Sequence, residues 1–458
     1  MTPAFADRQA AWAAYLRNLQ GRLPQQFPPL LASGRLVRMI GLVLEAEGFD
    51  ASVGTRCRVE GSHHRGIDAE VVGFHGDRLQ LMAAGDLQGV APGARVQPLP
   101  GQAQAGVGAR LLGRIVDGQG QVLDGQGPVL TERYVPLLGR PLNPMQRAPV
   151  QRPLDVGVRA INALFTVGRG ARMGLFAGSG VGKSVLLGMM ARHTDADIIV
   201  VGLIGERGRE VKEFIEEILG VEGRSRAVVV AAPADVPALT RIRGAHLATA
   251  IAEYFRDQGK HVLLLMDSLT RYAMAQREIA LAVGEPPATR GYPPSVFARL
   301  PALVERTGNG PEGGGSITAF YTVLMEGDDQ QDPIADNARA VLDGHIVLSR
   351  ALAEQGHYPA IDLEASISRV MPKIVAPEDL RRLHRLKALY ARYREHQDLI
   401  AVGAYTPGMD PLLDQAVQAH AGIVGFLRQD QREAVSLRVS REQLAMVMAP
   451  YMEATDHG

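Results

Sequence analysis

The sequence predicts an α/β protein whose core is a parallel sheet with helices on both faces, preceded by a small β-barrel and followed by a helical domain. Three observations support this prediction. Short alternating runs broken by glycine extend from about Ser33 to Pro98, apolar strand-like runs alternate with helical stretches up to about Pro372, and the pattern from Pro377 onward is helical. Many short strands separated by turns are typical of a barrel, and strand–helix alternation is typical of a parallel sheet.

The chain has 458 residues, 46% of them hydrophobic, which is enough to bury one large core and one or two smaller ones. The Gly/Pro-rich stretch 101–153 reads as the connection that follows the barrel. We therefore expect four parts, which are an N-terminal helix over 1–26, a β-barrel domain over 27–100, the core domain over 101–376 and a helical C-terminal domain over 377–458.

The charges balance, with 49 Lys plus Arg and 49 Asp plus Glu. A domain that binds nucleic acid is usually basic, and the barrel region has no paired aromatic residues among its basic ones, the usual platform for stacking single strands, so we expect no nucleic-acid partner. The single cysteine, Cys57, excludes an internal disulfide and is expected to be a buried apolar side chain. Neither a secretory signal nor a membrane-spanning run is evident, and we expect a soluble intracellular protein.

Residues 2–23 predict an amphipathic helix that Pro24 ends. Its apolar face carries residues at helical spacing, namely Phe5, Trp12, Leu16, Leu19 and Leu23. This face either packs on the protein itself or docks on a partner or a membrane surface. Amphipathicity alone does not distinguish these alternatives.

The strongest motif is a glycine-rich loop between a strand-like run and a helix-forming run. Its residues are Ala177, Gly178, Ser179, Gly180, Val181, Gly182, Lys183 and Ser184. This is the strand–loop–helix context of a phosphate-binding P-loop, in which backbone N–H groups and a helix N-terminus converge on phosphates. We expect Lys183 to reach the β- and γ-phosphates of a nucleotide and Ser184 to bind Mg²⁺ through its hydroxyl.

A P-loop also needs a carboxylate at the end of a neighbouring strand to hold the metal. Residues 261–267 read as a buried strand ending in Asp267, which we assign to the magnesium side of the site. Hydrolysis further needs a group that orients water near the γ-phosphate. The strand at 198–204 is expected to lie adjacent, and either Glu206 or Glu210 after it is a candidate, with the other available to pair with a nearby arginine.

The P-loop, Asp267 and the sequence Gly205-Glu206-Arg207 together resemble the catalytic subunits of rotary ATP synthases. Residues 359–368 match that superfamily's signature of Pro, a small and an aliphatic residue, Asp, three further residues and Ser-x-Ser. Within the superfamily the chain is most similar to the flagellum-specific export ATPases. The blocks that carry this similarity are 166–192, 202–211, 267–287 and 332–350.

The resemblance implies a RecA-like P-loop core that hydrolyses ATP with Mg²⁺. It implies that Glu206 polarises the attacking water and that Arg207 contacts the γ-phosphate. It also implies that Tyr358 stacks on the adenine and that Arg369 is an arginine finger offered to the neighbouring subunit's nucleotide. A finger supplied in trans explains why such an enzyme needs a ring, because the transition-state charge is completed across an interface.

The same resemblance implies a homohexamer in the cytoplasm, associated peripherally with the inner face of the plasma membrane. The expected partners are a stator-like regulator at the N-terminal helix, a central-stalk coiled-coil protein, an export-gate membrane protein, and chaperone–substrate complexes at the C-terminal domain. Three alternatives stay open: a virulence injectisome ATPase, a non-catalytic ring subunit and an RNA helicase of the same fold. Glu206 disfavours the second alternative, and the absence of an evident RNA-binding domain disfavours the third.

Overall fold

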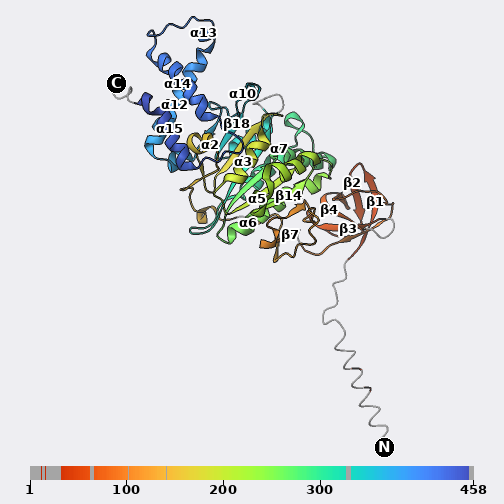
Figure 1. The fold of residues 1–458 in the computed structure, drawn as a ribbon. Helices are drawn as coiled ribbons and strands as arrows, with labels where there is room; N and C mark the ends of the chain where they lie inside the picture. Colours follow the sequence, from red (N-terminus) through yellow and green to blue (C-terminus); the bar gives the residue numbers. More distant parts are fainter. Residues whose placement is uncertain are drawn as a thin grey trace, which may run out of the picture.

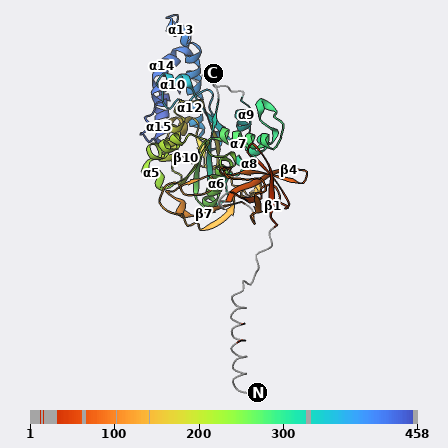
Figure 2. The same ribbon diagram turned by 90° about the vertical axis from the view of Figure 1, so that its right-hand side faces the viewer.

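The computed structural model describes residues 32–61, 66–101, 103–140, 142–325 and 332–452, together with Trp12 and Leu16. The predicted amphipathic helix otherwise lies outside the described residues; Trp12 and Leu16 are helical and exposed. The barrel and the C-terminal helices sit at opposite ends of a central sheet domain (Figures 1 and 2). Among the described helices, none combines the length and apolarity needed to cross a membrane.

A closed six-stranded barrel forms the first domain, as predicted. Its strands are β1 (Gly34–Ile40), β2 (Val43–Glu47), β3 (Arg56–Glu60), β4 (Gly66–His75), β5 (Arg78–Ala83) and β6 (Arg95–Pro98), in the order β1-β2-β5-β4-β3-β6. The alternation of inward and outward side chains is clear in β3, where Cys57 and Val59 are buried and Arg58 is exposed. Burial, with a contribution from Glu70, raises the pKa of the Cys57 thiol to about 11, so it stays protonated as the sequence led us to expect.

Short elements link the barrel to the core. Strands β7 (Gln104–Val107) and β9 (Arg133–Pro136) pair with each other, as do β10 (Pro153–Leu154) and β11 (Val167–Gly168). Along the chain, the 3₁₀ turn η2 (Ala109–Leu111) follows β7, and the 3₁₀ turn η3 (Pro144–Gln146) follows β9. Strand β8 (Ile115–Asp117) joins the edge of the central sheet. The division of the chain at residues 26, 100 and 376 stays a prediction.

The central sheet has nine strands in the order β19-β18-β12-β17-β15-β13-β14-β8, with β16 paired to β17. Its strands beyond β8 are β12 (Arg172–Ala177), β13 (Ile198–Ile204), β14 (Ala227–Ala232), β15 (His261–Asp267), β16 (Gly308–Asn309), β17 (Ser316–Leu324), β18 (Gly344–Leu348) and β19 (Ile367–Ser368). The strands from β8 to β18 along the sheet are parallel, and only the short β16 and β19 pair antiparallel.

The expected adjacency of β13 to the P-loop strand is wrong. Strands β17 and β15 lie between β12 and β13. The reason is that β17, which comes late in the chain, is a long run buried on both faces and takes the central position beside β12. Strand order in a parallel sheet follows from such packing between distant segments, which local pattern does not reveal.

Helices cover both faces of the sheet, as predicted. They are α2 (Arg159–Leu164), α3 (Lys183–His193), α4 (Gly208–Glu213), the π-helix η4 (Phe214–Leu219), α5 (Gly220–Ser225), α6 (Ala238–Asp257), α7 (Leu269–Ala282), the 3₁₀ turn η5 (Thr289–Gly291), α8 (Pro294–Val304), α9 (Pro333–Val341), α10 (Arg350–Glu354) and α11 (Met371–Ile374). Alternate residues of β15 enter opposite cores. Leu264 packs with α6 to α9, whereas Leu263 packs with α2, α3 and the C-terminal helices.

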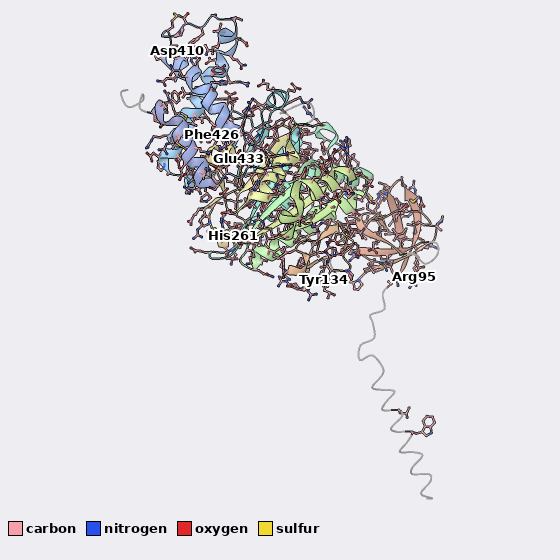
Figure 3. All side chains as sticks on the ribbon, in the orientation of Figure 1. Arg95, Tyr134, His261, Asp410, Phe426 and Glu433 are labelled. Carbon is pink, nitrogen blue, oxygen red and sulfur yellow. The ribbon has the colours of Figure 1, made fainter. Side chains whose placement is uncertain are left out.

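The C-terminal domain is helical, as predicted, with α12 (Pro377–Glu395), α13 (Gln397–Ala401), α14 (Pro411–Leu427) and α15 (Leu437–Met452). Arg159 of α2 connects the C-terminal domain to the core. The guanidinium donates to the carbonyls of Phe426 and Arg428 and pairs with Glu433 at 2.6 Å (Figure 3). The side chain of Gln429 in the same turn accepts from the Arg159 backbone N–H and donates to the Gly157 carbonyl.

The ion pair between Arg306 and Glu253 is nearly buried, at 2.6 Å, and ties α6 to the end of α8. Removing one partner of a buried pair leaves an uncompensated charge. We expect Arg306→Ala to lower the free energy of unfolding by about 3–5 kcal/mol, measured by urea titration. The matched control is Arg58→Ala, which breaks a surface pair with Asp68 and should cost less than about 1 kcal/mol. Equal unfolding midpoints for both variants would contradict the structural role of the buried pair.

Candidate active site

The phosphate loop has the strand–loop–helix form expected from the sequence. Strand β12 ends at Ala177 and α3 begins at Lys183, with Gly182 as its N-cap. Gly180 and Gly182 have φ values of 77° and 88°, a left-handed conformation that favours glycine. A Cβ atom at Gly182 would lie 3.4 Å from the ring of Tyr358, which is ordinary van der Waals contact, so the positive φ rather than crowding favours glycine there.

The parallel register brings three charged groups together at the carboxyl ends of the central strands. Asp267 ends β15 beside Leu203 of β13, and the loop after β13 carries Glu206. The ammonium of Lys183 lies 2.5 Å from Asp267 Oδ1 and 3.5 Å from Glu206 Oε1. All three side chains are at least about nine-tenths buried, at 11%, 4% and 12% exposure for Lys183, Asp267 and Glu206. The sequence-predicted Lys183, Asp267 and Glu206 therefore form one cluster.

Burial and neighbouring charges together shift the pKa values of Lys183 and Glu206. Burial lowers the pKa of the Lys183 amine, but the carboxylates of Asp267 and Glu206 outweigh it and raise that pKa above its ordinary value. Burial raises the pKa of Glu206 to about 7, helped by the charge of Asp267 and a hydrogen bond with Glu210, and opposed by Lys183 and Arg271. The site thus holds a firmly charged lysine beside a carboxyl that titrates near neutrality.

The two glutamates that the sequence left open occupy different environments. Glu206 contacts Lys183 inside the cluster. Glu210 is 38% exposed and lies 3.5 Å from the guanidinium of Arg207. Arg207 itself is 82% exposed, so the structure does not bring it into the buried cluster.

Arg271 is a residue that sequence reasoning missed. It lies in the first turn of α7, four residues after Asp267, and its side chain packs against Gly205, where an added Cβ would come within 2.7 Å. Its Nε atom is buried and has no hydrogen-bond partner among the described residues. A basic residue one turn beyond a strand-end carboxylate is the signal that could have identified it, because that turn faces the same sheet edge.

The oxygen ligands near the loop fit Mg²⁺. Ser184 offers a hydroxyl in the first turn of α3, and Asp267 offers a buried carboxylate. Within the described residues, no group of three or more His, Cys, Asp or Glu side chains could hold a metal alone. One carboxylate and one hydroxyl are instead the ligand set with which proteins bind Mg²⁺ together with substrate phosphates.

A cavity of about 420 Å³ opens beside the phosphate loop. Its lining includes Gly182, Val185, Met189, Leu348, Tyr358, Pro359, Gln429, Asp430 and Gln431. Tyr358, which the resemblance assigns to the adenine, lies at the wall of this largely apolar space next to the loop. The sequence analysis missed residues 429–431, because they belong to the C-terminal domain and no local motif marks them. The backbone N–H of Gln429 donates to the Tyr358 carbonyl at 3.0 Å, which fixes this wall.

The structure does not bring Arg369 to the cluster of its own chain. It follows the edge strand β19, is exposed, and contacts the backbone carbonyls of Leu342 and Arg339. Ser368 pairs with Gly344, which in turn pairs with Met173, four residues before the end of β12. That offset amounts to about 13 Å along the strand, away from the phosphate loop.

Comparison with known proteins places this arrangement in a family. The ATP synthase alpha/beta family nucleotide-binding domain matches residues 157–368, and that family's beta-barrel domain matches residues 36–100. The T3SS EscN ATPase C-terminal domain matches residues 375–446. A "Flagellum-specific ATP synthase" of Pseudomonas aeruginosa is 62% identical over 444 residues, covering 95% of this chain and 98% of that protein. The chain belongs to the flagellum-specific ATP synthase family.

Solved structures agree with this assignment. The assembled ATPase EscN from the type III secretion system of enteropathogenic E. coli matches with a TM-score of 0.85 and 43% identity, over 90% of this chain and 99% of EscN. The same ATPase in complex with its central stalk EscO matches with a TM-score of 0.83, at 43% identity and the same coverage. The family member described here is accordingly an ATPase with the barrel, nucleotide-binding and helical domains of its relatives.

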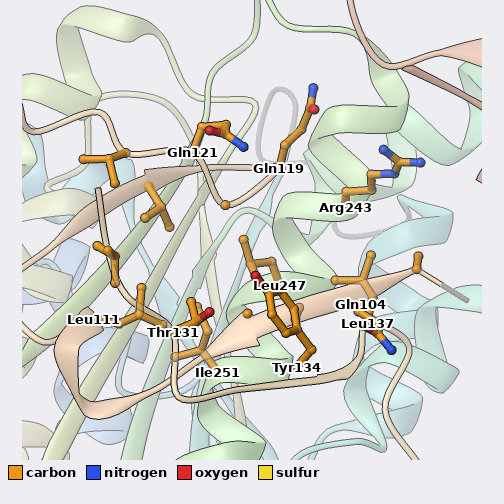
Figure 4. A pocket seen from close by; sticks show the side chains of 18 of the residues that line it. Gln104, Leu111, Gln119, Gln121, Thr131, Tyr134, Leu137, Arg243, Leu247 and Ile251 are labelled. Atoms are coloured by element: carbon orange, nitrogen blue, oxygen red, sulfur yellow. The ribbon is translucent and has the colours of Figure 1, made fainter. Parts of the chain in front are cut away.

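A second cavity of about 540 Å³ lies between the barrel, the β7–β9 ribbon and α6 of the ATPase (Figure 4). The charged side chains around it are already paired, Arg243 with Glu70 at 2.6 Å and Arg56 with Asp68 at 3.2 Å. The Arg56–Asp68 pair lies within the barrel, whereas the Arg243–Glu70 pair joins the barrel to α6 of the core, so we interpret the cavity as part of the domain junction.

Glu206 makes the stability of the nucleotide-free ATPase depend on pH. Its pKa is about 7 in the folded protein and ordinarily 4.5, so between these values the folded state holds a proton that the unfolded chain releases. Its contribution is therefore greatest below about pH 4.5 and declines as the pH rises to 7, by up to about 3 kcal/mol. The difference in unfolding free energy between wild type and Glu206→Gln, measured by urea titration, should fall by this amount across the range, because the titration of all other groups cancels in it. Glu213→Gln, at an exposed position of α4, is the control and should keep the wild-type pH dependence; a constant difference between wild type and Glu206→Gln would contradict the raised pKa.

Proposed function

We propose that this ATPase hydrolyses Mg–ATP in a ring of six subunits and energises protein export by a flagellar type III secretion apparatus. The observation that carries the proposal is the buried cluster of Lys183, Asp267 and Glu206 at the mouth of the phosphate loop. It combines a cation for phosphates, a carboxylate for a metal and a carboxylate for water in one place, which are the parts that phosphoryl transfer requires.

The phosphate loop supplies binding and charge. Backbone N–H groups of residues 178–182 and the N-terminus of α3 cradle the phosphates, and Lys183 exchanges its contact with Asp267 for the β- and γ-phosphates. Ser184 and Asp267 would hold Mg²⁺, which when bound neutralises charge that develops on the phosphate oxygens. The adenine enters the cavity beside Tyr358, whose ring stacks on the base, and residues 429–431 close the far side.

Water activation falls to Glu206. Its carboxyl is buried next to Lys183, whereas Glu210 is 38% exposed and lies beside Arg207. Since its pKa is about 7, the ionised form that polarises water is available at neutral pH. Arg271 is a second cation, after Lys183, whose charge acts on Glu206, and it would contact the γ-phosphate through its buried, unpartnered Nε. Arg207 would reach the γ-phosphate only after leaving Glu210.

The exposed position of Arg369 supports the proposed ring. Its guanidinium is exposed at the sheet edge, about 13 Å along the strand from its own phosphate loop, so it would complete the site of a neighbouring subunit. The relatives support assembly, because EscN has been solved in an assembled form and with a central stalk. For this chain we propose a coiled-coil stalk partner in the ring.

The export role rests on the flagellum-specific relatives, whose similarity extends over 95% of the chain. Their higher identity, 62% against 43% for EscN, favours the flagellar apparatus over a virulence injectisome. We further propose cytoplasmic location with peripheral attachment to the plasma membrane, a stator-like regulator at the N-terminal helix, an export-gate membrane protein, and chaperone–substrate complexes at the C-terminal domain.

The assignment of the water-polarising group predicts different outcomes for two isosteric variants. Glu206→Gln should bind Mg–ATP like wild type and lose nearly all hydrolysis, because it keeps shape but cannot accept a proton from water. Glu210→Gln should retain most activity. Steady-state phosphate release and equilibrium nucleotide binding measure both. Near-normal turnover of Glu206→Gln together with a dead Glu210→Gln would reverse the two roles.

The position of Arg369 predicts complementation between inactive subunits. Arg369→Ala should bind nucleotide almost normally and lose hydrolysis about a thousandfold or more. Mixing it with Glu206→Gln subunits should restore some activity, since certain interfaces then pair an intact site with an intact finger. Activity is measured across mixing ratios, with each parent alone as the control. Mixed rings that assemble, bind ATP and stay inactive at every ratio would exclude a finger in trans.

A further inference from the structure

A buried threonine contacts the carboxylate at the magnesium side of the site. Thr322 lies on β17, the strand between β12 and β15, and its side chain is fully buried. Its hydroxyl donates to Asp267 Oδ1 at 2.6 Å. Lys183 approaches the same oxygen at 2.5 Å, so within the described part of the chain both side-chain contacts of this carboxylate converge on Oδ1.

The packing of β17 does not by itself require a hydroxyl group at position 322. Thr322 is flanked by Tyr321 and Val323, and β17 is buried along almost its whole length, an environment in which valine fills the same volume. Thr318 lies four residues earlier on the same strand and is equally buried. Its hydroxyl accepts from the Gly170 backbone N–H at 2.8 Å, away from the cluster.

The two contacts on Oδ1 differ in what happens to them during the reaction. The side chain of Lys183 is flexible, and its ammonium group is expected to turn toward the phosphates when nucleotide binds. Thr322 is branched at Cβ and held in a packed central strand, so its hydroxyl stays in place. A donor that remains on Oδ1 keeps the carboxylate in one orientation and leaves Oδ2 as the oxygen available to a metal.

We propose that Thr322 is a positioning residue that holds Asp267 for Mg²⁺ after Lys183 has moved to the nucleotide. This inference rests on the proposed function, in which Asp267 is the magnesium-side carboxylate. Partners that orient a metal-side ligand commonly contribute about 10- to 100-fold to metal affinity or activity. The effect of losing the hydroxyl should therefore appear in the magnesium-dependent part of nucleotide binding.

The experiment compares the affinity of a fluorescent ATP analogue in excess Mg²⁺ and in EDTA for the full-length protein. Thr322→Val should reduce the gain in affinity that Mg²⁺ provides by about 10- to 100-fold, while affinity in EDTA changes less than about twofold. Thr322→Ser, which keeps the hydroxyl, should recover most of the gain. Thr318→Val is the matched control, because it removes an equally buried hydroxyl of the same strand and should leave the gain intact.

The possible outcomes distinguish the role of Thr322 from the assignment of Asp267 as the magnesium-side carboxylate. If Asp267→Asn loses the magnesium gain and Thr322→Val keeps it, Asp267 is the metal-side carboxylate and Thr322 does not position it. If Asp267→Asn also keeps the gain, the metal assignment fails and the role of Thr322 fails with it. A loss of the gain in Thr318→Val equal to that in Thr322→Val would show a general effect of β17 packing and overturn the inference. Should Thr322→Val not fold, Thr322→Ala carries the same expectation.

Discussion

The contact between Lys183 and Asp267 is the interaction on which the rest of the active site depends. Two buried charges are tolerated in a protein interior only when they are paired and hydrogen-bonded. Here the pair joins the start of α3 to the end of β15, two strands away across the sheet, with Thr322 of the intervening strand completing it. Burial and the charge of Asp267 raise the pKa of Glu206 to about 7 against the opposing charge of Lys183, while both carboxylates raise the pKa of the Lys183 amine.

The helical domain takes part in the same site from the other side of the phosphate loop. Gln429 links the Tyr358 carbonyl, the Arg159 backbone and the Gly157 carbonyl, so the wall of the nucleotide cavity and the end of α14 are one hydrogen-bonded unit. Arg159 reinforces this joint through Glu433. The wall of the cavity and the helical domain are therefore joined directly by hydrogen bonds of one residue.

The cations of the site are divided between the chain's own interior and its surface. Arg271 is held against Gly205 inside the subunit, whereas Arg207 and Arg369 are exposed. Within one subunit, Arg369 follows β19 beside the start of β12, away from the phosphate loop at the other end of that strand. Under the proposed function this division gives a physical reason for a ring, in which Arg369 of one subunit would complete the site of another.

The sequence by itself determined the features that depend on contiguous residues. The phosphate loop, the strand that ends in Asp267, the barrel and the C-terminal helices all follow from local periodicity and glycine placement, since a short segment carries the whole signal. Only the tertiary structure decided the insertion of β17 beside β12, the burial of Glu206 rather than Glu210, and the approach of Arg271, Thr322 and residues 429–431 to the site. Those outcomes depend on which distant segments pack together, and strand order in a parallel sheet is set by that packing rather than by any local pattern.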